Sequence, residues 1–319
     1  MPLHPPSPRP AKTGRSPVAP TRPGRDETRS LPIFRQMTIV GVGLLGGSLG
    51  MICKQQGLVE TVVGAGRRAE NLKTAVALKA IDRYSTDLAE AASGSDLLLL
   101  ATPVDTFEDA VKTCAPRLSR AAIVTDVGSV KGRLVTRLEA LVSDDIAVVG
   151  GHPIAGKEKS GVDAATLDLF RGARCILTPT PRTNPDALAK IRRLWEYTGA
   201  QVSEMDPDLH DRVLGAVSHL PHIVAYALVN AVAAIQESQT PELDLQAFSG
   251  GGYRDTTRIA ASSAEMWRDI CLWNRDNLVD QLDQYLCCLE TFKALIKSGD
   301  GEGLFREIER AKRVRERLM

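Results

Sequence analysis

The sequence lacks three features that would place it in specialised classes of protein. It has no uninterrupted apolar run of about 20 residues, the length that a helix needs to cross a bilayer. Its formal net charge is only +1, so no basic surface for nucleic acid is indicated. None of its six cysteines forms a CxxC pair, which argues against a metal site and favours reduced thiols in the cytoplasm. We expect the short apolar runs 97–102 and 223–235 to be core.

What remains is the composition of an ordinary soluble protein. Of its 319 residues, 43% are hydrophobic and 25% are charged, which suits about two domains. Residues 1–36 differ, because they hold nine of the 18 prolines and carry seven basic against two acidic side chains. Such a segment buries too little apolar surface to offset the entropy of ordering. We therefore predict a disordered tail; a transit peptide, or an extension upstream of a natural start at Met37, are weaker alternatives.

Short apolar runs alternate with helical segments from residue 37 to about residue 205. The runs expected to be buried parallel strands are 38–42, 61–65, 96–101, 123–127 and 146–149. Regular alternation of strand and helix with right-handed crossovers gives a Rossmann-like, doubly wound parallel sheet of the α/β class. Ligands of such a sheet bind at the carboxyl ends of the strands.

The pattern changes to long helical periodicity in residues 206–319. Helices are expected over 209–237, 264–297 and 302–318, which form a second, all-helical domain. Pro221 lies inside the first of these helices, where it removes one backbone donor and frees the carbonyl of Val217. We therefore expect a kink near His219 and His222.

A glycine-rich loop follows the first predicted strand. Its sequence fits GxGxxG, and it lies between a strand and a helix, as a dinucleotide site requires. Gly41 permits a tight turn, Gly43 lets the backbone approach a pyrophosphate, and Gly46 permits close helix packing. The backbone of Leu44 and Leu45 would supply donors at the helix amino terminus. The sequence therefore predicts binding of NAD or NADP.

The end of the second strand bears on which of the two cofactors is used. An acidic residue is expected there to bind the ribose hydroxyls of NAD, but the sequence has Arg67 and Arg68. Two arginines suit a 2′-phosphate, so NADP is at least as well supported as NAD. A solvated loop with relaxed selectivity is the equal alternative.

Two more loops follow predicted strands and are expected to border the nicotinamide. One contains Thr102 and Pro103, and the other contains Ser129, whose hydroxyl suits a hydrogen bond to a reacting group. Lys131 fits a solvent-facing position in the first helical turn as well as it fits a ligand.

His152 follows two glycines directly after the next strand. An imidazole that titrates near neutrality, placed at the nicotinamide end of the crevice, is suited to accept the proton of an alcohol whose carbon gives up hydride. We therefore predict that His152 is a catalytic base.

Taken together, five motifs resemble the prephenate/arogenate dehydrogenase family of tyrosine biosynthesis. They are the glycine loop and the segments 126–131, 150–161, 218–222 and 250–260. The resemblance covers the chain from Thr38 to its carboxyl terminus. It implies oxidative decarboxylation of prephenate to 4-hydroxyphenylpyruvate, or of arogenate to tyrosine.

The resemblance also implies roles for individual residues. His152 would take the proton of the ring hydroxyl, and Ser129 would orient substrate, histidine and cofactor. Arg258, in the first turn of a helix, would bind a substrate carboxylate. The side-chain pocket would be lined by His219, His222 and Trp267, and Glu158 would either hold the ammonium of arogenate or pair with a surface lysine. His210 and Asp211 would pair with each other without a catalytic role.

The family further implies a homodimer through the carboxyl-terminal helices. Leu278, Leu282, Leu286 and Leu289 form an amphipathic stripe that fits a partner interface or an intrachain core. Two other functions remain. A dinucleotide-binding sensor has no reason to retain His152, Ser129 and Arg258, and a β-hydroxyacid dehydrogenase needs a lysine that the helix 209–237 lacks.

Overall fold

The computed structural model describes residues 32–157 and 159–317. Most of the predicted tail 1–36 lies outside this part of the chain, but β1 begins at Phe34. Residues 34–36 therefore belong to a strand, which corrects the predicted boundary. Phe34 and Met37 are both buried in the core, so the strand is held by its own packing.

The described residues form an eight-stranded sheet in the order β3-β2-β1-β4-β5-β6-β7-β8. The strands are β1 (Phe34–Val40), β2 (Val59–Ala65), β3 (Arg83–Ser85), β4 (Leu97–Leu100), β5 (Ile123–Asp126), β6 (Ala147–Pro153), β7 (Arg174–Thr178) and β8 (Gln201–Glu204). The neighbours from β3 to β6 are parallel. The prediction of a Rossmann-like α/β fold is confirmed.

The sheet differs from the prediction at its far edge. The second half of β6 pairs with β7 in the antiparallel direction, with His152 opposite Ile176, and β8 then pairs parallel to β7. The described part of the β6–β7 connection contains only a short 3-10 turn, Val162–Ala164, where a parallel crossover would need a helix. The strand β6 therefore carries His152 within the sheet, where the prediction had placed it in a loop.

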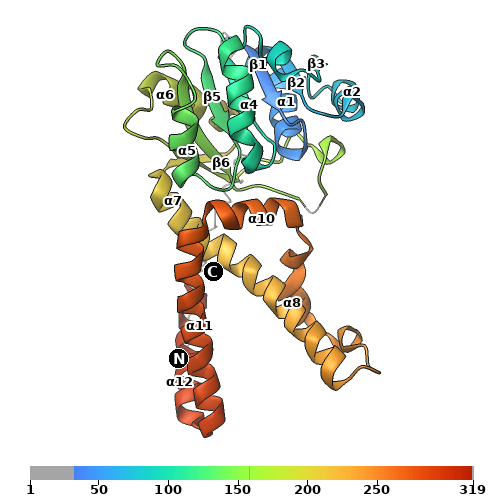
Figure 1. Ribbon diagram of the computed structural model, residues 1–319, viewed down its shortest axis with the longest axis vertical. Coiled ribbons are helices and arrows are strands. Elements are labelled where there is room, and N and C mark those ends of the chain that lie inside the picture. The colour runs from blue at the N-terminus through green and yellow to red at the C-terminus, as the bar shows by residue number, and fades with distance from the viewer. Residues whose placement is uncertain (1–31, 158, 318–319) are drawn as a thin grey trace, which may run out of the picture. The chain divides into compact units, whose positions relative to one another are not determined.

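Helices cover both faces of the sheet (Figure 1). They are α1 (Leu44–Gln56), α2 (Ala69–Ala77), α3 (Leu88–Ala92), α4 (Phe107–Cys114), α5 (Gly132–Glu139) and α6 (Pro185–Tyr197). Side chains of β1 alternate between two apolar clusters, as a strand buried on both faces requires. Ile39 packs with residues of α1 and α6, and Val40 packs with residues of α3, α4 and α5.

The chain after residue 206 is helical, as predicted. Its helices are α7 (Pro207–Leu214), α8 (Leu220–Gln239), α9 (Gly251–Thr257), α10 (Ala264–Trp273), α11 (Arg275–Ser298) and α12 (Gly301–Glu316). Trp267 and Ile270 of α10 pack into the same cluster as Leu134 of α5. The cluster therefore joins the helical part to one face of the sheet.

A π-helical turn, Gly215–His219, connects α7 to α8 and ends just before Pro221. Since proline has no N–H to donate to the carbonyl of Val217, the regular hydrogen-bond ladder is interrupted here. The interruption lies where the sequence predicted a kink. Widened turns of this kind often occur at functional sites.

The two short apolar runs do not behave alike. Leu97–Leu100 is fully buried in the sheet, as predicted. In contrast, the helical segment Pro207–Gln239 is long and apolar enough to pass a composition test for a membrane span, yet only 11% of its most apolar window is buried. The prediction that residues 223–235 are core is therefore wrong for the single chain, since Ala225 is the one fully buried residue of α8 and its other apolar side chains are partly buried or exposed.

Candidate active site

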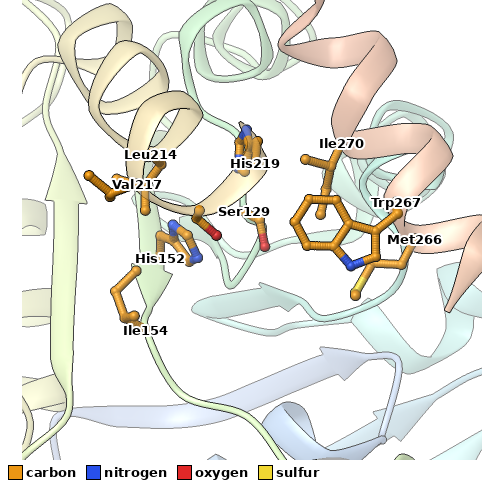
Figure 2. A pocket seen from close by; sticks show the side chains of 10 residues that line it. Ser129, His152, Ile154, Leu214, Val217, His219, Met266, Trp267 and Ile270 are labelled. Carbon is orange, nitrogen blue, oxygen red and sulfur yellow. The ribbon is translucent and has the colours of Figure 1, made fainter. Parts of the chain in front are cut away.

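A cavity of about 270 Å³ lies where the carboxyl ends of β5 and β6 meet the helical part of the chain. Figure 2 shows its wall, to which Ser129 contributes from the loop after β5 and His152 from the end of β6. The full lining is Ser129, His152, Ile154, Leu214, Val217, Ser218, His219, Met266, Trp267 and Ile270. A mostly apolar wall with a few polar groups is typical of a small-molecule site.

His152 is the first of two cavity histidines with a defined proton position. Its Nδ1 lies 2.9 Å from Nε2 of His210, whose own Nδ1 lies 2.8 Å from Oδ1 of Asp211. The carboxylate can only accept, so the proton of neutral His210 is on Nδ1 and its Nε2 accepts from His152 Nδ1–H. Nε2 of His152 is then left with a free lone pair.

His219 carries the opposite arrangement. Nδ2 of Asn274 donates to its Nδ1 over 3.0 Å, so the proton of the neutral ring is on Nε2. His219 is only 1% exposed, and this Nε2 forms no hydrogen bond within 3.5 Å among the described residues, although the backbone of Ser129 is close enough to affect the ring's pKa. The cavity therefore has an acceptor on His152 and a donor on His219.

Burial keeps both rings neutral. It lowers the pKa of His152 well below 6.5; a proton on the adjacent His210 would lower it further, as does the charge of Lys131. Burial also lowers the pKa of His219 to about 4. Near pH 7 each ring therefore presents one acceptor nitrogen and one donor nitrogen.

Lys131 is neither a surface residue nor a cavity ligand, so both readings of it are wrong. It is fully buried and forms an ion pair with Asp126. Asp126 also accepts hydrogen bonds from the backbone N–H groups of Gly128 (2.8 Å) and Gly151 (3.1 Å). One carboxylate thus fixes both the loop that carries Ser129 and the end of β6 that carries His152.

His222 and Trp267 form one wall element. Their rings stack with centroids 3.7 Å apart and an interplanar angle of 23°. Trp267 lines the cavity, whereas His222 is not among the lining residues. His222 is half-buried, and its Nδ1 donates to the carbonyl of Ser218 over 2.8 Å.

Arg258 is near this wall but does not line the cavity. The sequence placed it in the first turn of a helix; it lies instead directly after α9, in the 3-10 turn Arg258–Ala261. Its side chain is exposed, and its charge contributes to lowering the pKa of His222. Glu158 lies outside the described residues.

The glycine loop has the geometry that a dinucleotide phosphate needs. Gly41 has φ +94°, and a Cβ there would lie 2.7 Å from the carbonyl oxygen of Ala101. A Cβ on Gly46 would lie 2.6 Å from the carbonyl oxygen of Gly41, whereas one on Gly43 would meet open space. No side chain caps the amino terminus of α1, so the backbone N–H groups around Leu44 and Leu45 are open to an anion.

The other predicted cofactor residues surround this loop. Gly41 donates to the carbonyl of Ala65, the last residue of β2, and Arg67 and Arg68 follow it, both exposed. Neither guanidinium forms a hydrogen bond or ion pair with another described residue. Thr102 contacts the Gly41 position, and exposed Pro103 follows it.

The sequence did not identify His210, Asp211 or Asn274 as site residues. Their signal is three-dimensional, because His210 is 58 residues from His152 and Asn274 is 55 residues from His219. His210 and Asp211 do pair, as predicted. The prediction that they have no connection to catalysis needs correction, because His210 also contacts His152. No potential metal cluster of three or more His, Cys, Asp or Glu side chains occurs in the described part of the chain.

Comparison with known proteins agrees with this geometry. The family model for the nucleotide-binding domain of prephenate dehydrogenase matches residues 49–204, and the model for its dimerization domain matches residues 206–310. The prephenate dehydrogenase of Bacillus subtilis is 34% identical over 88% of this chain and 75% of its own length. The cyclohexadienyl dehydrogenase of Zymomonas mobilis is 33% identical over 89% of this chain and 96% of its own.

A solved structure extends the similarity to three dimensions. Prephenate dehydrogenase of Aquifex aeolicus, in complex with hydroxyphenyl propionate and NAD+, is 40% identical and superimposes with a TM-score of 0.83, covering 89% of this chain and 98% of that one. The chain therefore belongs to the prephenate/arogenate dehydrogenase family, nicotinamide-dependent oxidoreductases of tyrosine biosynthesis.

Proposed function

We propose that the protein converts prephenate to 4-hydroxyphenylpyruvate and carbon dioxide, with Nε2 of His152 as the acceptor for the ring-hydroxyl proton. The observation that carries this proposal is the 2.9 Å contact between Nδ1 of His152 and Nε2 of His210, from which the proton position on His152 follows. Because its Nδ1–H is directed to His210, the ring offers its Nε2 lone pair to a ligand. A hydroxyl bound there would donate to His152, and Nε2–H of His219 supports a second contact to a ligand oxygen.

When bound, NAD(P) would accept the hydride. As the C–H bond of the ring carbon breaks, the hydroxyl on that carbon becomes strongly acidic, so a histidine with a lowered pKa is a sufficient base. The carboxylate then leaves as carbon dioxide and its bond electrons complete the aromatic ring. Since the product is a phenol, His152 returns the proton to the same oxygen, and no proton is released overall.

The remaining residues would bind and orient the substrate. Ser129 lines the cavity with His152 and suits a hydrogen bond to the reacting hydroxyl. The stacked pair His222 and Trp267 would enclose the side chain of the substrate. Arg258, whose charge reaches His222, would bind a carboxylate with its planar guanidinium.

The glycine loop and the two arginines would bind the cofactor. Gly41, Gly43 and Gly46, with the backbone of Leu44 and Leu45, would hold the pyrophosphate, and Thr102 and Pro103 would border the nicotinamide half. The exposed pair Arg67 and Arg68 supports use of NADP as well as NAD. In this scheme residues 37–205 bind the cofactor, and residues 206–319 complete the substrate site and form a cytoplasmic homodimer.

Arogenate is the second candidate substrate, because the similar Zymomonas mobilis protein is a cyclohexadienyl dehydrogenase. The deciding experiment measures reduced cofactor with prephenate or arogenate and with NAD+ or NADP+, and compares kcat/KM for the four pairs. Highest kcat/KM with prephenate supports the proposal. Highest kcat/KM with arogenate reverses the substrate assignment. If no reduced cofactor forms with any of the four pairs, the protein is not a dehydrogenase of these substrates.

The role of the arginines is tested with the double variant R67A/R68A. Loss of charge-assisted hydrogen bonds should raise KM for NADP+ by about 10-fold or more while KM for NAD+ stays within about twofold. Arg120 is exposed before β5, at the other end of the sheet, so R120A is the matched control. An unchanged KM for NADP+ in the double variant would reject this role.

A further inference from the structure

His210 and Asp211 form a buried polar pair outside the lining of the cavity, so neither would touch the substrate. Both side chains belong to α7, and both are almost fully inaccessible. Asp211 has a further function, because Oδ1 accepts from the backbone N–H of Lys131 over 2.7 Å and Oδ2 accepts from that of Gly132 over 2.9 Å. The carboxylate is therefore fixed at the amino terminus of α5 and cannot rotate away from His210.

We propose that His210 and Asp211 are positioning residues that hold the proton of His152 on Nδ1 and so leave Nε2 as its acceptor atom. This inference rests on the proposed function of His152. His210 contacts His152 and Asp211, not the cavity, so the pair acts on the reaction only through His152.

The hydrogen-bond geometry excludes the other proton positions. If His152 carried its proton on Nε2, its Nδ1 lone pair would face Nε2 of His210 at 2.9 Å. His210 could relieve this contact only by moving its own proton to Nε2. Its Nδ1 lone pair would then face the carboxylate of Asp211 at 2.8 Å. Asp211, held by two backbone donors, therefore determines the proton positions on both rings.

The same series of hydrogen bonds favours the protonated form of His152, which exists only during the reaction. Lys131 lies near enough for its charge to oppose a proton on this ring, but Lys131 is itself paired with Asp126. Asp211 places a negative charge behind the ring, with His210 between them. This arrangement supports an imidazolium that exists only while hydride and carbon dioxide leave.

The variant D211N tests the proposal because it replaces a group that can only accept: an amide nitrogen in place of Oδ1 donates to Nδ1 of His210, although it also faces the backbone N–H of Lys131. The proton of His210 then moves to Nε2 and that of His152 moves to its own Nε2, which removes the acceptor. We expect kcat to fall by about 100-fold or more, with KM for substrate and the Kd for cofactor within about threefold. D208N is the matched control, since Asp208 is an exposed carboxylate of the same helix near Gly132.

The variants H210L and H210Q provide a second comparison that leaves Asp211 and α5 intact. Leucine cannot accept from His152, whereas the amide oxygen of glutamine can. H210Q should therefore retain at least about tenfold more kcat than H210L. Equal kcat in the two variants, or kcat near the wild-type value in both, would overturn the proposal.

Nitrogen NMR of protein labelled with 15N-histidine and saturated with NAD+ reads the proton positions without any turnover. In the wild type, His152, identified by the signals missing in H152N, should show a protonated Nδ1 and an unprotonated Nε2. D211N should reverse this pattern. A proton on Nε2 in the wild type contradicts the positioning role, even if the activity assay finds a different substrate.

Discussion

At the scale of single residues, the proposed chemistry depends on a weak base. Burial lowers the pKa of His152 well below 6.5, which at first appears unsuited to proton abstraction. The proton that it would accept belongs to a hydroxyl that becomes strongly acidic only as hydride leaves. A weak base is also a ready donor in its protonated form, and this suits the return of the proton to the phenol.

The substitution H152N tests this role. Asparagine keeps polarity at the site but has no basic nitrogen, so kcat should fall by about 100-fold or more, the usual contribution of a general base. The Kd for NAD+, measured by fluorescence titration, should stay within about twofold, because His152 is not part of the glycine loop. H222N is the comparison: it should raise KM for the substrate and change kcat little. Unchanged turnover in H152N would reject the assignment.

Some site residues can be predicted from sequence and others cannot, for a physical reason. His152, His219 and His222 lie in short, unusual segments, so their composition alone marks them. His210 was predicted to pair with Asp211 without a catalytic role, because what matters is a 2.9 Å contact with a residue 58 positions away. Lys131 was misjudged for the same reason: its position in the sequence indicates a first helical turn but not the buried Asp126 that neutralises it.

At the scale of secondary-structure elements, two glycines in the turn from β1 into α1 have different roles. Gly46 is needed for packing, and Gly43 is proposed to leave space for the cofactor. Gly46 faces the carbonyl oxygen of Gly41 and the side chain of Ile39, whereas Gly43 faces open space. A methyl group at Gly46 must therefore displace protein atoms. A methyl group at Gly43 has room, but it occupies the space proposed for the pyrophosphate.

The pair G43A and G46A should accordingly differ. G43A should keep the free energy of unfolding within about 0.5 kcal/mol of wild type and weaken NAD+ binding by about tenfold or more. G46A should lose about 1 to 3 kcal/mol, the usual range for overpacking. Denaturant unfolding without cofactor, followed by NAD+ titration of each variant, makes the measurement. An unchanged NAD+ affinity in G43A would show that the pyrophosphate does not bind at this loop.

Elements were predictable where their apolar pattern was strong. The five predicted strands are confirmed as β1, β2, β4, β5 and β6. They could be recognised because buried parallel strands are runs of apolar residues. The strands that the sequence missed, β3, β7 and β8, have three to five residues each, and two of them form the edges of the sheet. Their pairing depends on neighbours that only the folded sheet provides.

At the scale of the whole molecule, three buried histidines make stability depend on pH. His152, His210 and His219 all have a lowered pKa, in each case chiefly because of burial. The unfolded chain takes up protons near pH 6.5, whereas the folded protein does not. Stability is therefore complete above about pH 6.5 and falls as the pH decreases toward the folded pKa, which for His219 is about 4.

This dependence can be measured by urea unfolding at several values between pH 7.5 and 5.0. Below pH 6, each such histidine should contribute a slope approaching 1.4 kcal/mol per pH unit. H219Q, which removes one of the three groups, should show a slope smaller by nearly that amount. Parallel stability curves for wild type and variant would show that His219 titrates normally in the folded protein.

Most of the large apolar side chains that are exposed lie in the helical part of the chain. Leu286 and Leu289 of α11 are 54% and 45% exposed, and only 11% of the most apolar stretch of Pro207–Gln239, which includes α8, is fully buried. Leu278, from the same predicted stripe, is buried within the chain, so the stripe is divided between core and surface. A soluble protomer rarely leaves so much apolar surface in contact with water. The match of residues 206–310 to a dimerization domain supports a second copy as the covering partner.

The double variant L286E/L289E tests this interface. Light scattering after size exclusion should give twice the protomer mass of 34.5 kDa for wild type, and the single mass for the variant at micromolar concentration, since two charges buried against a partner are costly. L78E is the control, because Leu78 is a similarly exposed leucine, at 41%, beside α2. It should remain a dimer. A dimer that persists in L286E/L289E would place the interface elsewhere and leave this face of α11 without a partner.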